Sequence, residues 1–327
     1  MLRSETAANP QRMAQALEGL RRYQEAEREP PRAMAPAVTS RLGASLRDYG
    51  GSGAPVLFVP SLINPPTVLD LDGERSLLRW LATQGHHPLL LDWGGDVAAR
   101  AGLSVTDHVE QILLPFVAAL GECPTLVGYC LGGTMAMAAA ARADVRGVAA
   151  IAAPWHFDGF PAQDRDALAR LWHNAESTAR ALGVLPMEVL QSAFWSLDPA
   201  RTVAKFEAFA AMAADAAKAR AFVRLEDWAN DGPPLPAAAA RELFEDFIGG
   251  DRPARGWRIG GTPVEPPANL LNIVSTTDRI VPAATAARGG ERIELALGHV
   301  GMVVGSRARA SLWEPLAAWL SRRTREC

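Results

Sequence analysis

The stretch LVGYCLGGTMAMAAAA (residues 126–141) joins a short apolar run to an alanine-rich run through a corner rich in glycine. Its centre, GYCLG, has the Gly-x-nucleophile-x-Gly spacing that places a nucleophile on a sharp turn between a strand and a helix, with Cys130 where a serine is usual. Gly128, Gly132 and Gly133 leave the room that such a corner needs. The N-terminus of the following helix favours a thiolate and a developing oxyanion. The stretch therefore predicts Cys130 as a nucleophile, although most free cysteines are small buried hydrophobes.

Short apolar runs and amphipathic runs alternate on both sides of this stretch. Strands that alternate with helices of this length predict a mostly parallel sheet with right-handed crossovers and helices on both faces. The expected strands lie at 55–59, 87–93, 124–129, 145–154 and 268–278, and the expected helices at 73–85, 104–121 and 132–141.

The chain divides into three predicted parts. Residues 1–38 form an N-terminal helix and a proline-rich linker, and residues 39–154 together with 262–327 form the α/β core. Residues 155–261 contain helical and aromatic segments that are broken by prolines, with few strands. We therefore expect them to form a helical cap inserted into the core.

The composition limits the range of partners. Hydrophobic residues make up 49% of the chain, charged residues 21%, and the net charge is -3, which argues against nucleic acid as a ligand. No apolar run reaches the roughly 18 residues of a membrane span, and the N-terminus lacks a signal-peptide core. The three cysteines show neither metal-ligand spacing nor a disulfide framework. These features predict a cytoplasmic protein with no metal site.

An acid and a base follow the nucleophile in the order that an α/β-hydrolase requires. Asp278 ends the apolar run LLNIVSTTD, and His299 follows the next apolar segment, between Gly298 and Gly301. Taken alone, the aspartate is more often a helix cap and the histidine a loop residue. The joint occurrence of Cys130, Asp278 and His299 in chain order predicts a catalytic triad on an α/β-hydrolase fold.

Other residues are placed near the triad by their position in the chain. The expected oxyanion hole uses the backbone N–H of Leu131, the residue after the nucleophile, and of Leu62, in the loop after the first central strand. Ligands of such sheets gather at the carboxyl ends of the strands. The candidate pocket residues are Ile63, Asn64, Asp92, Trp93, Tyr129, His156 and Val300, although Asp92 and Trp93 fit turn and packing roles better.

Several separate segments resemble the polyhydroxyalkanoate synthases. The segments GYCLGGTMA, FVRLEDWANDGPPLP, VSTTDRIVP and GHVGMVVG are similar to the family's cysteine lipase box, cap exit and catalytic Asp and His segments. The segment LFVPSLINPPTVLDLDGERSLLRW resembles its Val-Pro-Pro-x-Ile-Asn and Leu-Asp-Leu signatures, with Ser61 in place of the second proline. The likeness covers roughly residues 40 to 320. Without the long N-terminal domain of the largest synthases, the chain resembles the short forms, which work with a separate subunit.

The resemblance implies an acyltransferase that polymerises (R)-3-hydroxyacyl-CoA and releases CoA. In that reaction Cys130 is acylated, His299 is the base, and Asp278 orients His299 or helps to activate the incoming hydroxyl. A thiol suits this chemistry because thioester exchange is near energetic balance and leaves the acyl group transferable. CoA enters as substrate and no cofactor is implied. The implied partners are the growing polyester and either a second copy of the chain or a synthase subunit, with the granule surface as the place of work.

Two other functions remain open from the residues themselves. A thioesterase, esterase or lactonase uses the same fold and triad with water as the acceptor, because the fold does not decide the acceptor. A catalytically silent protein that coats polymer granules, or that partners a true synthase, is the third reading. An intact triad argues against this third function.

Overall fold

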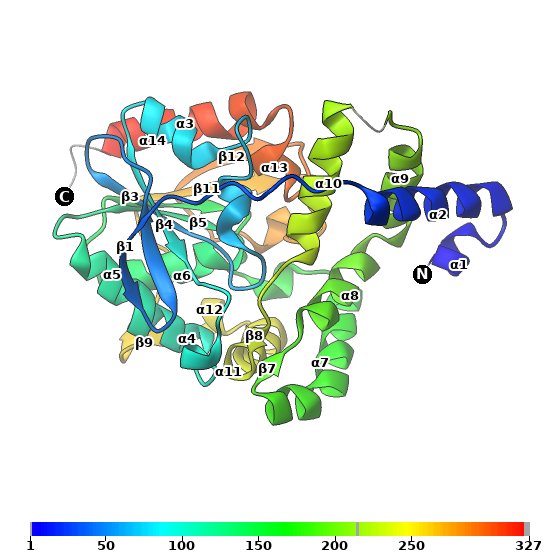
Figure 1. Cartoon of the computed structure of the whole chain (residues 1–327). Helices are drawn as coiled ribbons and strands as arrows, with labels where there is room; N and C mark the ends of the chain where they lie inside the picture. The colour runs from blue at the N-terminus through cyan, green and yellow to red at the C-terminus, as the bar shows by residue number, and fades with distance from the viewer. Residues whose placement is uncertain (1, 214–215, 324–327) are drawn as a thin grey trace.

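The computed structural model describes residues 2–213 and 216–323 and has one central sheet of eight strands (Figure 1). The strand order is β1-β2-β4-β3-β5-β6-β11-β12. The first two strands pair antiparallel, as do β2 and β4, and all the later neighbours are parallel. The bounds are β1 (Ala37–Arg41), β2 (Ala44–Asp48), β3 (Pro55–Val59), β4 (His87–Asp92), β5 (Thr125–Tyr129), β6 (Gly147–Ile151), β11 (Leu270–Ser275) and β12 (Glu291–Leu295).

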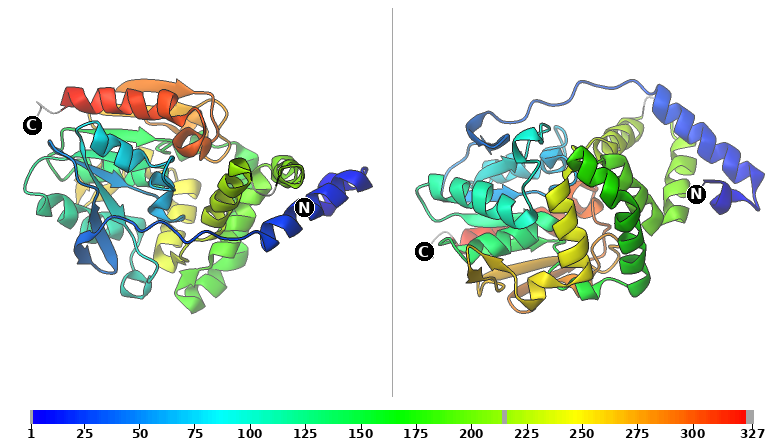
Figure 2. Two further views of the ribbon diagram at one scale, coloured as in Figure 1. Left: turned by 45° about the horizontal axis from the view of Figure 1, so that its top comes forward. Right: turned by 90° about the horizontal axis from the view of Figure 1, so that it is seen from below.

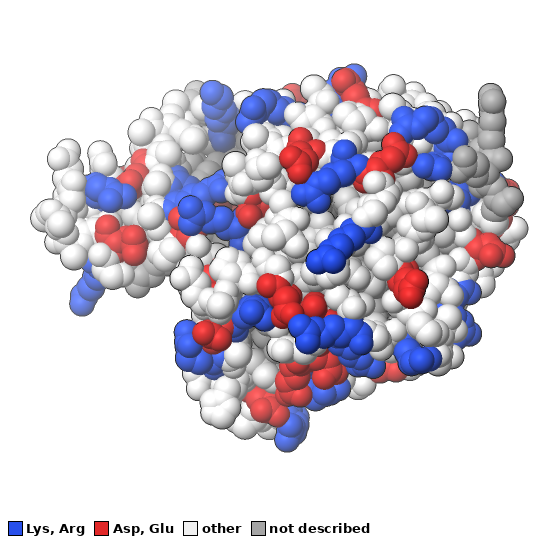
Figure 3. All heavy atoms as spheres, turned by 180° about the vertical axis from the view of Figure 1, so that it is seen from behind, with Lys and Arg blue, Asp and Glu red and all other residues white. Residues whose placement is uncertain are grey.

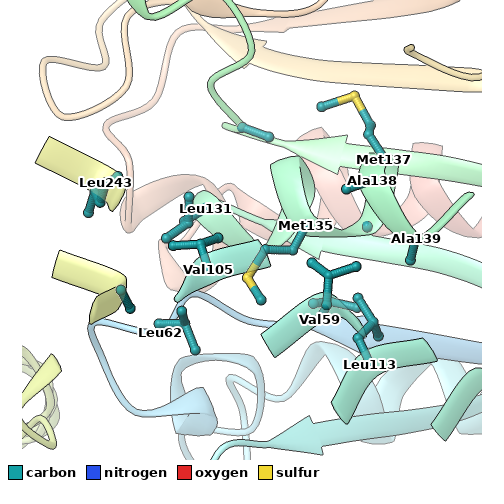
Figure 4. Close-up of a cluster of buried hydrophobic side chains, with 14 of the residues drawn as sticks. Val59, Leu62, Val105, Leu113, Leu131, Met135, Met137, Ala138, Ala139 and Leu243 are labelled. Atoms are coloured by element: carbon teal, nitrogen blue, oxygen red, sulfur yellow. The ribbon is translucent and has the colours of Figure 1, made fainter. Parts of the chain in front are cut away.

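Helices cover both faces of the sheet, and the central strands are buried along their whole length. Alternate residues of β3 enter different apolar clusters, Leu57 and Val59 on one face and Val56 and Phe58 on the other. The first cluster contains residues of α4 (Val105–His108), η3 (Val109–Leu113), α5 (Leu114–Ala119) and α6 (Leu131–Ala140) (Figure 4). The second contains residues of α3 (Leu77–Thr83), α13 (Gly301–Val304), η7 (Arg309–Trp313) and α14 (Glu314–Arg323). Burial on both faces explains why these strands read as continuous apolar runs.

Four longer helices lie beside the carboxyl ends of the parallel strands (Figures 1 and 2). They are α7 (Ala162–Leu182), α8 (Met187–Leu197), α9 (Pro199–Ala210) and α10 (Ala217–Asn230). The two-residue strand β7 (Val184–Leu185), between α7 and α8, pairs antiparallel with β8 (Leu235–Pro236), which follows α10. All of these elements fall in the segment 155–261, for which the sequence predicts a cap.

Short elements connect this helical region back to the sheet. After β8 the chain forms α11 (Ala237–Arg241), η5 (Glu242–Gly249), α12 (Arg252–Arg255), β9 (Arg258–Ile259) and β10 (Thr262–Pro263) before it enters β11. The buried carboxylate of Glu242 accepts hydrogen bonds from the backbone N–H and the hydroxyl of Thr106, and Arg252 pairs with it at 2.9 Å. This network ties the exit of the helical region to the start of α4. The single-turn segments are η1 (Pro66–Leu69), η2 (Ala98–Arg100), η4 (Phe157–Gly159) and η6 (Ala283–Thr285).

The N-terminal helices α1 (Leu2–Thr6) and α2 (Pro10–Glu25) lie away from the sheet and pack on the helical region (Figures 1 and 2). Arg12 pairs with Glu207 of α9 at 2.8 Å, and the Tyr23 hydroxyl donates to Asp227 of α10 at 2.7 Å. Gly19 permits close contact, because a Cβ there would lie 1.9 Å from the carbonyl O of Phe206. Helices α1 and α2 therefore pack on α9 and α10 rather than on the sheet.

The surface carries interspersed charges, with basic and acidic side chains side by side on the face in Figure 3. Many of them form ion pairs, including Arg165 with Asp158 at 2.7 Å and Arg322 with Glu291 at 2.7 Å. Among the described residues, no helix combines the length and apolar character that crossing a membrane requires.

Candidate active site

Cys130 lies at the corner between β5 and α6 with φ 55° and ψ -133°. A positive φ is uncommon for a residue with a side chain and marks a strained turn. The glycines around it let three backbones meet: a Cβ at Gly128 would lie 2.2 Å from the Cα of Gly133, and one at Gly132 would lie 2.0 Å from the carbonyl O of Val59. The Cys130 N–H donates to Ile151 O of β6 at 2.9 Å. The corner is therefore fixed at the carboxyl edge of the sheet.

Asp278 and His299 meet at the same edge. Asp278 follows β11, His299 follows β12, and His299 Nδ1 lies 2.6 Å from Asp278 Oδ2. The other carboxylate oxygen of Asp278 accepts from the backbone N–H groups of Ile280 and Val281, at 2.8 Å and 3.1 Å. Asp278 is 6% exposed and His299 8%. The carboxylate is thus held on both sides, and one edge of the imidazole is fixed.

The electrostatics of His299 depend on Asp278 and Cys130. Burial lowers the pKa of His299, but the charges of Asp278 and Cys130, and hydrogen bonds to both, raise the pKa to about 10. His299 is therefore an imidazolium at neutral pH, in contact with the sulfur of Cys130.

The two expected oxyanion donors lie in one region of the structure. Leu131 is the first residue of α6, and Leu62 belongs to the loop after β3. Both side chains are buried in the same apolar cluster (Figure 4). This loop presses on α6, since a Cβ at Gly132 would lie 2.6 Å from Pro60 O, and the Trp93 indole N–H donates to that carbonyl at 3.0 Å. The role of these N–H groups stays a prediction.

Some candidate pocket residues are engaged in contacts within the protein. Asp92 is buried and pairs with Arg47 at 2.8 Å, and Trp93 is 3% exposed and braces the loop after β3. These contacts match the turn and packing roles that the sequence favours. Tyr129 is buried against His299, and Val300 packs half-buried on the second cluster.

The remaining candidates lie at two different places. Ile63 and Asn64 contact the end of α10: Asn64 Nδ2 lies 3.5 Å from Ala229 O, and a Cβ at Gly232 would lie 2.9 Å from Ile63 O. His156 lines a separate cavity of about 760 Å³, whose wall includes neither Cys130 nor His299 among the described residues. The contact of His156 with the substrate of the triad stays a prediction.

Helices α9 and α10 contact the loops that follow β3, β11 and β12. Asp198 precedes the first residue of α9, and its Oδ2 lies 3.7 Å from Nε of Arg279, the residue after Asp278. The guanidinium of Arg201 lies against Gly298, where a Cβ would sit 3.3 Å from its Nη2. On α10, the Trp228 indole N–H donates to Pro65 O at 2.8 Å. Sequence reasoning missed these contacts, because contacts between loops and distant helices leave no periodic pattern.

The cysteines differ in state. Cys130 is a free thiol, whereas Cys123 is disulfide-bonded. The spacing of the three cysteines, which shows no disulfide framework, did not predict this bond. Within the described residues, no group of three or more His, Cys, Asp or Glu side chains is arranged to hold a metal ion.

Solved structures share this architecture. The fold matches a bromoperoxidase from Bacillus anthracis (TM-score 0.55, 14% identity, 88% of this chain and 99% of that one). It also matches a thermophilic esterase from Thermogutta terrifontis (TM-score 0.54, 15% identity, 90% and 100%) and a monoacylglycerol lipase from Paleococcus ferrophilus (TM-score 0.53, 16% identity, 86% and 99%). The chain has the α/β-hydrolase fold.

Sequence relatives are more specific, although no protein-family model matches. The chain is 28% identical over 297 residues to the poly(3-hydroxyalkanoate) polymerase subunit PhaC of Haloferax mediterranei, and 26% identical over 304 residues to that of Haloarcula marismortui. These alignments cover 83% and 86% of this chain but 59% and 64% of the relatives. The PhaC subunit of Allochromatium vinosum is 28% identical, with 82% of this chain and 81% of the relative covered. The chain is therefore a homologue of PhaC.

Proposed function

We propose that the chain is an acyltransferase that forms polyester from (R)-3-hydroxyacyl-CoA through an acyl group on Cys130. The observation that carries this proposal is a free cysteine on a strained turn, in contact with a buried His299–Asp278 pair, in a homologue of PhaC. The names of the relatives state a poly(3-hydroxyalkanoate) polymerase subunit. The chain spans less than two thirds of the haloarchaeal relatives, so the complete activity is part of the proposal.

In the first half-reaction the thiolate of Cys130 attacks the thioester carbonyl. The backbone N–H groups of Leu131 and Leu62 receive the developing oxyanion. The bond from the acyl carbon to the CoA sulfur breaks, and the imidazolium of His299 gives its proton to that sulfur. The product is a thioester on Cys130 with free CoA, and His299 is neutral.

In the second half-reaction the 3-hydroxyl of another unit attacks the acyl carbon on Cys130. Neutral His299 takes the hydroxyl proton, an ester bond forms, and the thioester to Cys130 breaks. The thiolate and the imidazolium are restored, so the proton balance closes over one cycle. Asp278 keeps the imidazole oriented and stabilises its charge.

The acceptor distinguishes this function from hydrolysis. A thioesterase, esterase or lactonase uses water in the second half-reaction, and the pair of Asp278 and His299 serves either acceptor. Helices α9 and α10 over the loops of the site support the polymerase, because the exclusion of water protects an acyl-enzyme from hydrolysis. We expect the chain to act with a second copy or a separate synthase subunit, in the cytoplasm at the surface of polyester granules.

The test is incubation of the purified chain with 3-hydroxybutyryl-CoA, with CoA release followed and the product analysed. Insoluble polyester that accounts for the released CoA supports the proposal. Free 3-hydroxybutyrate alone would move the chain to the thioesterases. No CoA release from hydroxyacyl-CoA donors of several chain lengths would contradict the polymerase and the thioesterase, and would favour an esterase, a lactonase or a silent granule or partner protein.

A further inference from the structure

Tyr129, the last residue of β5, contacts His299 at two points. Its ring stacks on the imidazole with the centroids 5.0 Å apart and the planes 30° from parallel. Its hydroxyl donates a hydrogen bond to the backbone carbonyl O of His299 at 3.3 Å. Tyr129 is 4% exposed, so its ring surface is taken up by contacts within the protein.

These contacts restrain motions that the carboxylate leaves free. The bond from Asp278 fixes the Nδ1 edge of the imidazole at 2.6 Å, but the ring can still rotate about that bond. A stacked aromatic ring limits this rotation. The backbone around His299 is flanked by Gly298 and Gly301, and the Tyr129 hydroxyl gives its carbonyl group a fixed partner.

The charges also favour a tyrosine at this place. The face of an aromatic ring attracts a cation, and His299 is an imidazolium at neutral pH. Burial, together with the charges of Cys130 and Asp278, raises the pKa of Tyr129 well above its usual value. The phenol therefore stays protonated and acts as a hydrogen-bond donor, which leaves proton transfer to His299.

We propose that Tyr129 is a positioning residue that holds the imidazole of His299 in the orientation in which it contacts Cys130. Because Tyr129 directly precedes Cys130, the end of one strand fixes both partners of the pair. The proposal rests on the proposed function of Cys130 and His299, and it assigns Tyr129 no contact with the substrate.

The test measures the rate of alkylation of Cys130 by iodoacetamide across a range of pH, read by mass spectrometry of its peptide. Tyr129→Leu removes both contacts, and we expect the rate at neutral pH to fall about tenfold and the midpoint of the profile to rise by about one pH unit. Tyr129→Phe keeps the stack and loses one hydrogen bond, so a fall of about threefold is expected. Tyr49→Phe is the matched control, because Tyr49 follows β2 and its N–H donates to Pro88 O at the amino end of β4, the opposite edge of the sheet from the triad. We expect it to leave the profile unchanged.

A wild-type pH profile in both Tyr129 variants, with unchanged circular dichroism and unfolding temperature, would overturn the proposal. If Tyr129→Leu does not fold, Tyr129→Phe decides, and a rate equal to that of Tyr49→Phe would overturn it. Alkylation needs no acyl-CoA, so the result does not depend on polymer formation. A wild-type profile like that of a free cysteine peptide would instead contradict the Cys130–His299 pair of the proposed function.

Discussion

The pKa of His299 is raised to about 10, which sets the order of proton transfers in the proposed reaction. Asp278 Oδ2 lies 2.6 Å from His299 Nδ1, and both residues are buried. In the proposed reaction, the proton already lies on the imidazole, so His299 begins the cycle as an acid towards the CoA sulfur. It becomes a base only after that proton has left. The same residue then accepts the proton of the incoming hydroxyl.

The charge of His299 makes the stability of the protein depend on pH. Its pKa in the folded protein is raised from 6.5 to about 10, so its stabilisation is complete below pH 6.5 and is lost as the pH rises through about 10. We expect the difference in unfolding temperature between wild type and His299→Asn to shrink across this window. Thermal unfolding at a series of pH values checks this. A difference that stays constant with pH would show that His299 holds no such charge.

The corner between β5 and α6 depends on close contact with the end of β3. A Cβ at Gly132 would lie 2.0 Å from the carbonyl O of Val59, a clash with backbone that a rotamer change cannot relieve. Gly132→Ala should therefore lower the free energy of unfolding by about 1–3 kcal/mol and abolish acylation of Cys130. Denaturant unfolding and acylation measure the two effects.

The matched control for this corner is Gly102→Ala. Nothing lies within 4 Å of the Cβ that this change adds. Its stability and acylation should stay near wild type. Equal behaviour of the two variants would show that the corner is not as close-packed as the structure has it.

The sequence predicted the elements better than their contacts. Apolar runs predict β3, β5 and β11 because strands buried on both faces need continuous apolar residues. The glycines around Cys130 predict the corner because its geometry excludes side chains. The stacking of Tyr129 on His299, and the contact of Arg201 with Gly298, join residues far apart in the chain. Such contacts have no sequence period, so only the structure reveals them.

At the scale of the whole molecule, the N-terminal helices pack against α9, which contacts the loops of the site. Helix α2 packs on α9, and α9 contacts the loops of Asp278 and His299 through Asp198 and Arg201. The packing of α2 on α9 therefore helps to hold α9 in its position beside these loops. The ion pairs in this contact are partly exposed, so each is worth little and close packing carries the contact.

Gly19 tests this connection because the two effects of a substitution have opposite signs. Alanine stabilises an isolated helix relative to glycine by about 0.5–1 kcal/mol, but a Cβ at Gly19 would lie 1.9 Å from Phe206 O of α9. We expect Gly19→Ala to accelerate hydrogen exchange in α2 and α9 while β5 stays protected. Gln15→Ala, on the exposed side of α2, is the control. Unchanged exchange in α9 would show that α2 does not brace it.

The central claim is that Cys130 carries the acyl group. The most direct measurement is to mix the protein with 3-hydroxybutyryl-CoA, stop the reaction in acid, and map the acyl adduct by mass spectrometry. The account predicts an adduct on the Cys130 peptide that hydroxylamine removes, and no adduct and no CoA release in Cys130→Ala. Release of CoA by Cys130→Ala at the wild-type rate would contradict it.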